Sequence, residues 1–185
     1  MSVVVLILAA GESKRYGDVK QLADIDGQPM LRRVLLNLLA PEEYHVIVVL
    51  GANAEVIHPI IEDLDVTICA NHQWEEGMSS SIKAGLEMIE TEYAETTGLV
   101  IVLGDQWKLS RGEVDKLMES AKHSTDSIIA TNYNGKPGVP VYFPKGEWAD
   151  LKSLKGDEGA KQLLQRKPGI VLVDLPNAAF DLDER

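Results

Sequence analysis

The sequence has a single cysteine, Cys69, among its 185 residues. One thiol can form neither an intramolecular disulfide nor a thiolate zinc site, so a reducing compartment fits. The sequence also lacks a long apolar run, because the opening MSVVVLILAA is too short to span a bilayer. No positively charged segment precedes that stretch, as one would in a signal peptide. We therefore interpret it as a first strand, and we expect a cytoplasmic protein with no membrane partner.

Positive charge is scarce as well. The chain has 18 Lys and Arg against 29 Asp and Glu, which gives a net charge of −11. Such a surface repels polyphosphate backbones, which argues against a general nucleic-acid binder. A small anionic ligand would need a local positive pocket. Lys14, Arg15 and Lys20 gather beside Gly11 and Gly17, and this cluster is the candidate.

What the sequence does contain is an alternation of apolar, β-branched runs with amphipathic segments. Three of the runs are apolar throughout, as expected for strands covered by helices on both sheet faces. The alternation predicts a mostly parallel, doubly wound, three-layer α/β fold, most simply a single domain over residues 1–185. We expect strands at 3–8, 45–50, 65–69, 99–103, 127–131, 139–143 and 170–174, and helices at 29–39, 53–64, 79–93 and 111–122. Pro29 is expected at a first helical position, Pro59 as a breaker, and Ser110 with Glu113 as a capping box.

In such sheets, ligands bind outside the carboxyl ends of the strands. The loops after 3–8, 65–69 and 99–103 should therefore converge on one site. The first loop reads AAGESKRYGDVK, where Gly11 lets a phosphate approach backbone N–H groups. It is neither a Walker A loop nor GxGxxG, and it carries its own cations, which could stabilise charge on a leaving pyrophosphate. The alternative is a glycine turn with solvated charges.

The other two loops offer hydroxyls and a carboxylate. EEGMSSSIKAGL precedes a predicted helix, and its three serines exceed the one that capping needs. The extra hydroxyls either cap redundantly or face a ribose or base. GLVIVLGDQW ends a buried strand at Asp105, whose carboxylate suits Mg²⁺ bound together with phosphates. The alternative is a solvated loop acid.

The first loop also resembles a known family. LAAGESKRYGDVKQL is similar to the LAAGxSxRxGxxK signature of the nucleotidyltransferases related to the molybdenum-cofactor cytidylyl- and guanylyltransferases. The resemblance implies that Arg15 and Lys20 bind the triphosphate and carry catalysis, that Lys14 assists, and that residues 8–11 frame the base and phosphates. In that family an Ala-Ala-Gly turn accompanies CTP, whereas Ala-Gly-Gly accompanies GTP. The matching positions are Leu8, Ala9, Ala10, Gly11, Ser13, Arg15, Gly17 and Lys20.

The likeness extends to the other two loops. GMSSSIKAGL resembles the GMSSSIxxGL block of the cytidylyl branch, which implies nucleotide placement by Gly77, Met78, Ser79, Ser80 and Ser81. Asp105 and Gln106 match the family's Asp-Gln-Pro, in which the Asp binds the metal, and Trp107 replaces the proline. We assign Gln106 to the acceptor side.

Three further segments match less fully. GxPxxF (Gly138, Pro140, Phe143) and GDxGA (Gly156, Asp157, Gly159, Ala160) are placed by the resemblance beside the acceptor. Without it, Asp157 would be read as a helix cap. In the ending FDLDER, Asp181 and Asp183 align with two family acids that precede Thr-Pro, one of which supplies a carboxylate to the metal. The alternative is a frayed acidic tail.

The resemblance implies a nucleotidyl transfer reaction that uses Mg²⁺. CMP would pass from CTP to the phosphate of molybdopterin, pyrophosphate would leave, and a molybdenum hydroxylase could receive the product. Two alternatives stay open. The acceptor could be a sugar or polyol phosphate, or the chain could be a nucleotide- or cofactor-binding accessory protein without turnover.

Overall fold

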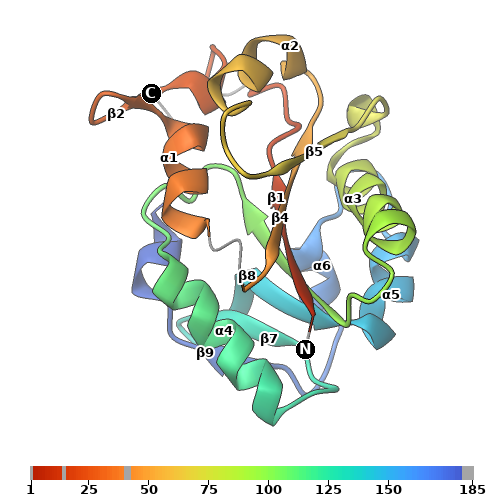
Figure 1. Cartoon of the computed structure of the whole chain (residues 1–185). Helices are drawn as coiled ribbons and strands as arrows, with labels where there is room; N and C mark the ends of the chain where they lie inside the picture. Colours follow the sequence, from red (N-terminus) through yellow and green to blue (C-terminus); the bar gives the residue numbers. More distant parts are fainter. Residues whose placement is uncertain (1, 14–15, 40–42, 181–185) are drawn as a thin grey trace.

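A seven-stranded sheet runs through the centre of the protein in the order β5-β4-β1-β6-β8-β7-β9 (Figure 1). The computed structural model describes residues 2–13, 16–39 and 43–180. All strands of the sheet run parallel except β8, which is antiparallel to both β6 and β7. The strands are β1 (Val3–Leu8), β4 (His45–Leu50), β5 (Thr67–Ala70), β6 (Gly98–Leu103), β7 (Ile129–Tyr133), β8 (Lys136–Pro144) and β9 (Val171–Val173). A separate small hairpin pairs β2 (Asp24–Ile25) with β3 (Gln28–Pro29).

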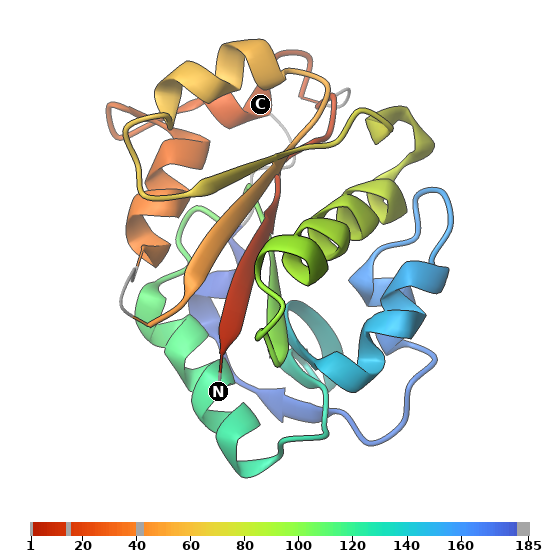
Figure 2. The same ribbon diagram turned by 45° about the vertical axis from the view of Figure 1, so that its right-hand side comes forward.

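Helices cover both faces of the sheet, as Figures 1 and 2 show. One layer contains α1 (Met30–Leu38), α2 (Ala54–Ile57) and α4 (Arg111–His123), and the other contains α3 (Met78–Glu92), α5 (Trp148–Ser153) and α6 (Ala160–Leu164). Side chains of β1 alternate between them: Val5 and Ile7 pack in the first layer, and Val4 and Leu6 in the second. All four are fully buried, so the predicted three-layer, mostly parallel fold is confirmed.

Two prolines set helix boundaries. Pro59 lies in the 3₁₀ turn η2 (His58–Ile60), and the helix expected over 53–64 ends at Ile57. Proline cannot donate a helical hydrogen bond, which explains the break. Pro29 has extended backbone at the end of β3, so the first helix begins at Met30 rather than at Pro29. The remaining 3₁₀ turns are η1 (Lys20–Leu22), η3 (Trp74–Glu76), η4 (Lys145–Glu147) and η5 (Pro176–Ala179).

Most other boundaries lie within a few residues of the prediction. β5 begins at Thr67 rather than at residue 65, because Val66 is held in a tight turn by its N–H bond to the Leu64 carbonyl (2.8 Å). The β2–β3 hairpin and the helix α5 were not predicted. The predicted capping box of α4 is confirmed, because the Ser110 N–H donates to Glu113 Oε2 (3.1 Å). No helix among the described residues is long and apolar enough to cross a membrane.

Strand register determines which loops meet. Leu8 at the end of β1 pairs with Val49 of β4 on one side and with Leu103 of β6 on the other. Just beyond the strands, the Gly104 N–H donates to the Leu8 carbonyl (3.0 Å). The chain segments after β1 and β6 therefore leave the sheet side by side, and residues 9–13 start out next to Asp105.

Candidate active site

A cavity of about 760 Å³ opens at the carboxyl ends of β1 and β6. Its walls come from the three loops expected to converge there, after β1, β5 and β6. The η1 turn adds a fourth wall, and Asp157 reaches the cavity from the second half of the chain. The described residues that line it are Leu8, Ala9, Ala10, Gly11, Glu12, Ser13, Lys20, Gln21, Met30, Trp74, Glu75, Gly77, Met78, Ser81, Leu103, Gly104, Asp105 and Asp157.

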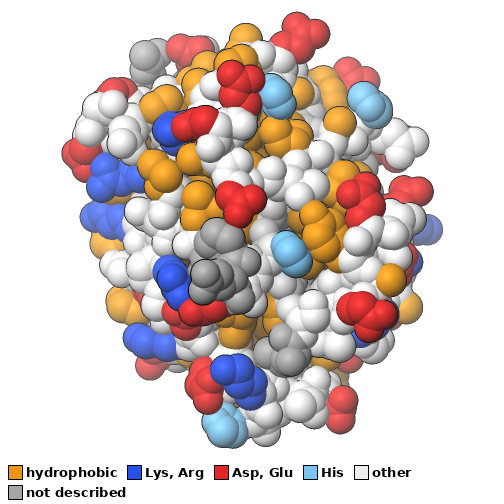
Figure 3. Space-filling view, in the orientation of Figure 1, with side chains coloured by type: hydrophobic (Ala, Val, Ile, Leu, Met, Phe, Trp, Pro, Cys, Tyr) orange, Lys and Arg blue, Asp and Glu red, His pale blue; other side chains and the backbone are white. Residues whose placement is uncertain are grey.

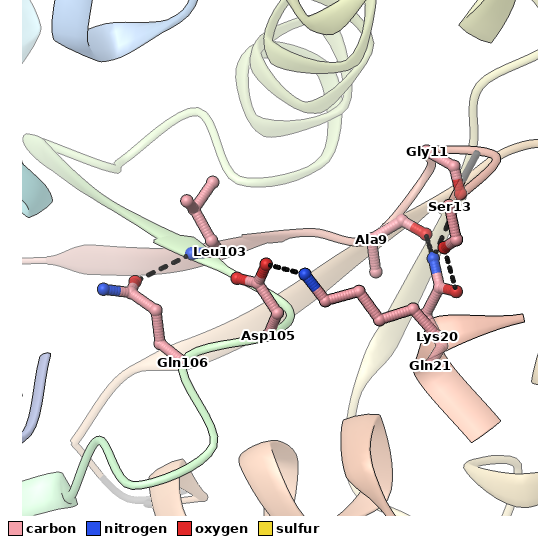
Figure 4. A network of polar contacts seen from close by, with 8 residues as sticks. All are labelled: Ala9, Gly11, Ser13, Lys20, Gln21, Leu103, Asp105 and Gln106. Atoms are coloured by element: carbon pink, nitrogen blue, oxygen red, sulfur yellow. Dashed lines mark hydrogen bonds and ion pairs between the residues drawn. The ribbon is translucent and has the colours of Figure 1, made fainter. Parts of the chain in front are cut away.

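An ion pair joins two walls of this cavity. Lys20 Nζ lies 2.7 Å from Asp105 Oδ2, and the two side chains are 14% and 22% exposed (Figure 4). The other carboxylate oxygen, Oδ1, is buried and has no hydrogen-bond partner in the described part of the chain. Within the described residues, Oδ1 of Asp105 is therefore left for a further donor or a cation.

The first loop is held from within by Gln21, which was not predicted as a site residue. Its Nε2 donates to the carbonyls of Ala9 (2.9 Å) and Gly11 (3.2 Å), and its Oε1 accepts from the Ser13 hydroxyl (3.2 Å). Ser13 itself has a positive φ of 60°, a conformation that costs energy for a residue with a side chain. Gln21 follows Lys20 directly in η1, so one short turn supplies both a charge and a loop clamp.

The loop after β6 is held in a similar way by Gln106, whose side chain is buried. Its Oε1 accepts from the Leu103 N–H (3.1 Å), and its Nε2 donates to the carbonyls of Val139 (3.0 Å) and Ala178 (2.8 Å). Both amide hydrogens are thereby used within the protein, and Gln106 is not among the described residues of the cavity wall. The acceptor contact predicted for Gln106 stays a prediction, and this geometry does not support it.

The three serines at the start of α3 have different environments. Asn71 Nδ2 donates to the hydroxyls of both Ser80 (2.8 Å) and Ser81 (3.0 Å), and Ser80 in turn donates to the Gly77 carbonyl (2.8 Å). Ser81 alone of the three serines lines the cavity. Asn71 was not predicted as a site residue. Its position directly after a strand of a parallel sheet is a pattern that could have indicated it.

Gly77 is required where the serine loop meets the second half of the chain. Its φ is +95°, and a Cβ there would lie 2.5 Å from Asp157 Oδ1. The neighbouring Ser79 N–H donates to the Gly156 carbonyl (3.0 Å). The segment around residues 156–159 thus packs on the serine loop and brings Asp157 to the cavity. The cap of α6 is Gly159 rather than Asp157.

The cavity is rich in carboxylates. Glu12, Glu75, Asp105 and Asp157 line it together with Lys20, the one cation among its described residues. The surface seen in Figure 3 likewise has Asp and Glu scattered over it, interspersed with Lys and Arg. A strongly anionic ligand is therefore disfavoured unless further cations enter with it or adjoin the wall.

The donor set of the wall fits a hard divalent cation shared with a ligand. Within the described residues, no cluster of three or more His, Cys, Asp or Glu side chains could hold a metal by itself. Asp105 Oδ1, which no described residue hydrogen-bonds, offers one carboxylate oxygen. Mg²⁺ commonly takes one or two carboxylates and completes its shell with substrate phosphates and water.

Several predicted site residues lie elsewhere or outside the described residues. Among the described part of the chain, Ser79, Ser80, Gly138, Pro140, Gly156 and Gly159 are not on the cavity wall. The Pro140 carbonyl accepts from the Thr131 hydroxyl (2.7 Å) within the sheet. Four predicted residues, Lys14, Arg15, Asp181 and Asp183, fall outside the described residues. Trp74, Glu75 and Met30 line the cavity without having been predicted.

Comparison with known proteins identifies the family of the chain. The model of the MobA-like NTP transferase domain matches residues 5–171. The nicotine blue oxidoreductase of Paenarthrobacter nicotinovorans is 31% identical over 177 residues, 91% of this chain and 85% of that protein. The purine catabolism protein PucB of Bacillus subtilis is 30% identical over 170 residues, 86% of this chain and 79% of that one. A probable molybdenum cofactor guanylyltransferase of Natronomonas pharaonis is 34% identical over 141 residues, covering 76% and 67%.

Solved structures share the fold. The Mycobacterium sp. strain JC1 homologue of M. tuberculosis Rv0371c superposes with a TM-score of 0.80 at 26% identity, covering 98% of this chain and 90% of that one. Rv0371c itself, solved in complex with manganese, gives a TM-score of 0.75 at 19% identity, covering 95% and 89%. The chain belongs to the MobA-like NTP transferase family and is a nucleotidyltransferase.

Proposed function

We propose that this enzyme transfers CMP from CTP to the phosphate of a molybdopterin-type acceptor, with Mg²⁺ as its metal and pyrophosphate as the second product. The observation that supports it most is the Lys20–Asp105 pair, which places a cation and a carboxylate 2.7 Å apart on facing walls of a cavity at the strand ends. A triphosphate needs the first group, and a shared Mg²⁺ needs the second.

The reaction needs no protein nucleophile. An anionic oxygen of the acceptor phosphate attacks the α-phosphorus of CTP, and the bond from that phosphorus to the pyrophosphate oxygen breaks. Lys20 and Arg15 bind phosphate oxygens and stabilise the charge that collects on the leaving group, and Lys14 assists them. When bound, Mg²⁺ neutralises phosphate charge, and Asp105, whose Oδ1 has no hydrogen-bond partner among the described residues, would hold it.

Gly11 gives the nucleotide room. It lines the cavity, and a Cβ built on it would meet no atom within 4 Å. The space beside this turn is therefore open to a ligand, which agrees with a role in framing the base and phosphates. The choice of CTP rests on the Ala9-Ala10-Gly11 turn and the serine block. The relative named as a guanylyltransferase makes GTP the competing nucleotide.

The acidic wall explains why the metal is part of the proposal. Four carboxylates line the cavity, so a free triphosphate is repelled, whereas a Mg²⁺-loaded triphosphate has much of its charge neutralised. Binding of CTP should therefore depend strongly on Mg²⁺. The same repulsion argues against the alternative of an accessory protein that binds a nucleotide without a metal ion.

Pyrophosphate release tests the proposal directly. The purified chain is incubated with CTP, GTP, ATP or UTP, each without an acceptor, with molybdopterin, or with a sugar or polyol phosphate, in Mg²⁺ and in EDTA. We expect release only with CTP, molybdopterin and Mg²⁺ present together. Release with GTP would change the nucleotide, and release only with a sugar or polyol phosphate would change the acceptor. Nucleotide binding without release under any condition would replace the enzyme proposal by the accessory protein.

A further inference from the structure

Each member of the ion pair is followed in the sequence by a buried glutamine. Lys20 precedes Gln21, a residue that is 6% exposed, and Asp105 precedes Gln106, which is 3% exposed. Figure 4 shows the pair between the two glutamines, with one amide bonded to the β1 loop and the other to the end of β6. Burying an amide side chain costs free energy unless its hydrogen bonds are made. Each glutamine is therefore held in one orientation by its hydrogen-bond partners.

The orientation of the Gln21 amide follows from its partners. Carbonyl oxygens only accept, so the NH₂ group must face Ala9 and Gly11, and both of its hydrogens are used there. The oxygen then faces Ser13, whose hydroxyl donates to it. Gln21 thus fixes three alternate residues of the loop just before Lys14 and Arg15, and it does so from the turn that carries Lys20.

Gln106 is fixed by the same reasoning. The Leu103 N–H can only donate, so Oε1 faces it, and the NH₂ group faces the carbonyls of Val139 and Ala178. These partners come from β6, β8 and η5, so one side chain ties the Asp105 loop to three separate elements. A second contact holds η5 nearby, where the Asn177 N–H donates to Glu113 Oε1 (2.9 Å).

We infer that Gln21 and Gln106 are positioning residues that hold Lys20 and Asp105 facing each other across the cavity. This inference rests on the proposed function of the site. Both charged residues lie outside the strands of the sheet, and a phosphate or metal site works only when its groups are held within a fraction of an ångström. Gln21 positions the triphosphate-binding side, and Gln106 positions the metal-binding side.

Two nearly isosteric variants, Gln21→Met and Gln106→Met, remove the amides and keep the volume. Gln165→Met is the matched control, because Gln165 is exposed at the end of α6. For each protein we measure CTP binding by calorimetry at saturating Mg²⁺, and Mn²⁺ binding by electron paramagnetic resonance at fixed CTP. Melting temperatures are recorded alongside.

The two variants should fail differently. Gln106→Met is expected to weaken Mn²⁺ binding by at least about tenfold, because the loop that carries Asp105 loses its hydrogen bonds to β8 and η5. Gln21→Met is expected to weaken CTP binding by about tenfold, with a smaller effect on Mn²⁺. Gln165→Met should match the wild type in both assays. A purely structural role would lower both melting temperatures without separating the two affinities.

Folded variants that bind Mn²⁺ and CTP within about twofold of the wild type would overturn the inference. If a methionine variant does not fold, the asparagine variant replaces it. Asparagine keeps a neutral amide but is one methylene shorter, so it cannot reach all three partners and should show the same loss. A wild-type protein that binds no nucleoside triphosphate at all would instead overturn the proposed function, which keeps the two failures distinct.

Discussion

The Lys20–Asp105 pair predicts an energetic coupling that can be measured without any substrate. At the observed 2.7 Å separation and an effective dielectric constant near 20, the Coulomb attraction is about 6 kcal/mol. Partial removal of both ions from water offsets most of it, and a charged hydrogen bond in proteins contributes about 1.5–3 kcal/mol net. Repulsion from the other cavity carboxylates lowers the effect of removing Asp105. We therefore expect Asp105→Asn to lower the free energy of unfolding by about 1–3 kcal/mol, or roughly 2–12 °C in Tm.

A double-mutant cycle isolates the pair. Lys20→Met, Asp105→Asn and the double variant are compared with the wild type by denaturant unfolding, and the expected coupling is about 1–3 kcal/mol. The control cycle uses Lys122 and Glu119, which are 2.8 Å apart but each 58% exposed. Its coupling should be much smaller, because solvent screens an exposed pair. If the unfolding free-energy change of the double variant equals the sum of the two single changes to within about 0.5 kcal/mol, the predicted coupling between Lys20 and Asp105 is refuted.

The same variants separate stability from catalysis. With Asp105→Asn still folded at the assay temperature, Mg²⁺-dependent pyrophosphate release should fall by at least about 10²-fold, because the carboxylate proposed to hold the metal is gone. Unchanged turnover would exclude Asp105 from the site. The exposed Glu119→Gln variant is the control and should release pyrophosphate at the wild-type rate.

Three further predictions concern the glycines, the metal and the cysteine. Gly11→Ala should leave Tm within about 2 °C, because its Cβ would meet no atom within 4 Å, and it should weaken CTP binding at least about tenfold, because Gly11 lines the cavity proposed to hold the nucleotide. Gly77→Ala should instead lower the unfolding free energy by more than about 2 kcal/mol, because φ is +95° and the Cβ would lie 2.5 Å from Asp157 Oδ1. Equal effects of the two in thermal melts and CTP titrations would contradict this assignment. EDTA should abolish turnover, and added Mg²⁺ should restore it; full activity in EDTA would refute the metal requirement. Burial raises the pKa of the Cys69 thiol, so Cys69 of the folded protein should react slowly with iodoacetamide at pH 8, and fast labelling would contradict its burial. The contribution of Cys69 to the free energy of unfolding should be lost as pH rises above about 8.5, because the thiol ionises first in the unfolded chain.

Much of the fold follows from patterns that are local in the sequence. The runs 3–8 and 99–103 are apolar at every position, and 45–50 is apolar after His45, a pattern typical of strands covered on both faces. Once the strands are parallel, their carboxyl ends share an edge, so the glycine loop, the serine loop and Asp105 had to approach one another. The sequence alone therefore predicted the three loops that line the cavity, and motif resemblance identified the family.

Tertiary structure alone decided the partners within those walls. Lys20 and Asp105 are 85 residues apart, and Gln106 reaches a carbonyl 72 residues away, distances over which no periodicity carries information. The antiparallel direction of β8 and the selection of Ser81 as the cavity-lining serine also depend on packing between distant elements. Local patterns specify which face of an element is buried, whereas hydrogen-bond and ion-pair partners depend on how the layers stack. The sequence therefore predicted which loops meet at the candidate site, and the fold determined which side chains hold those loops together.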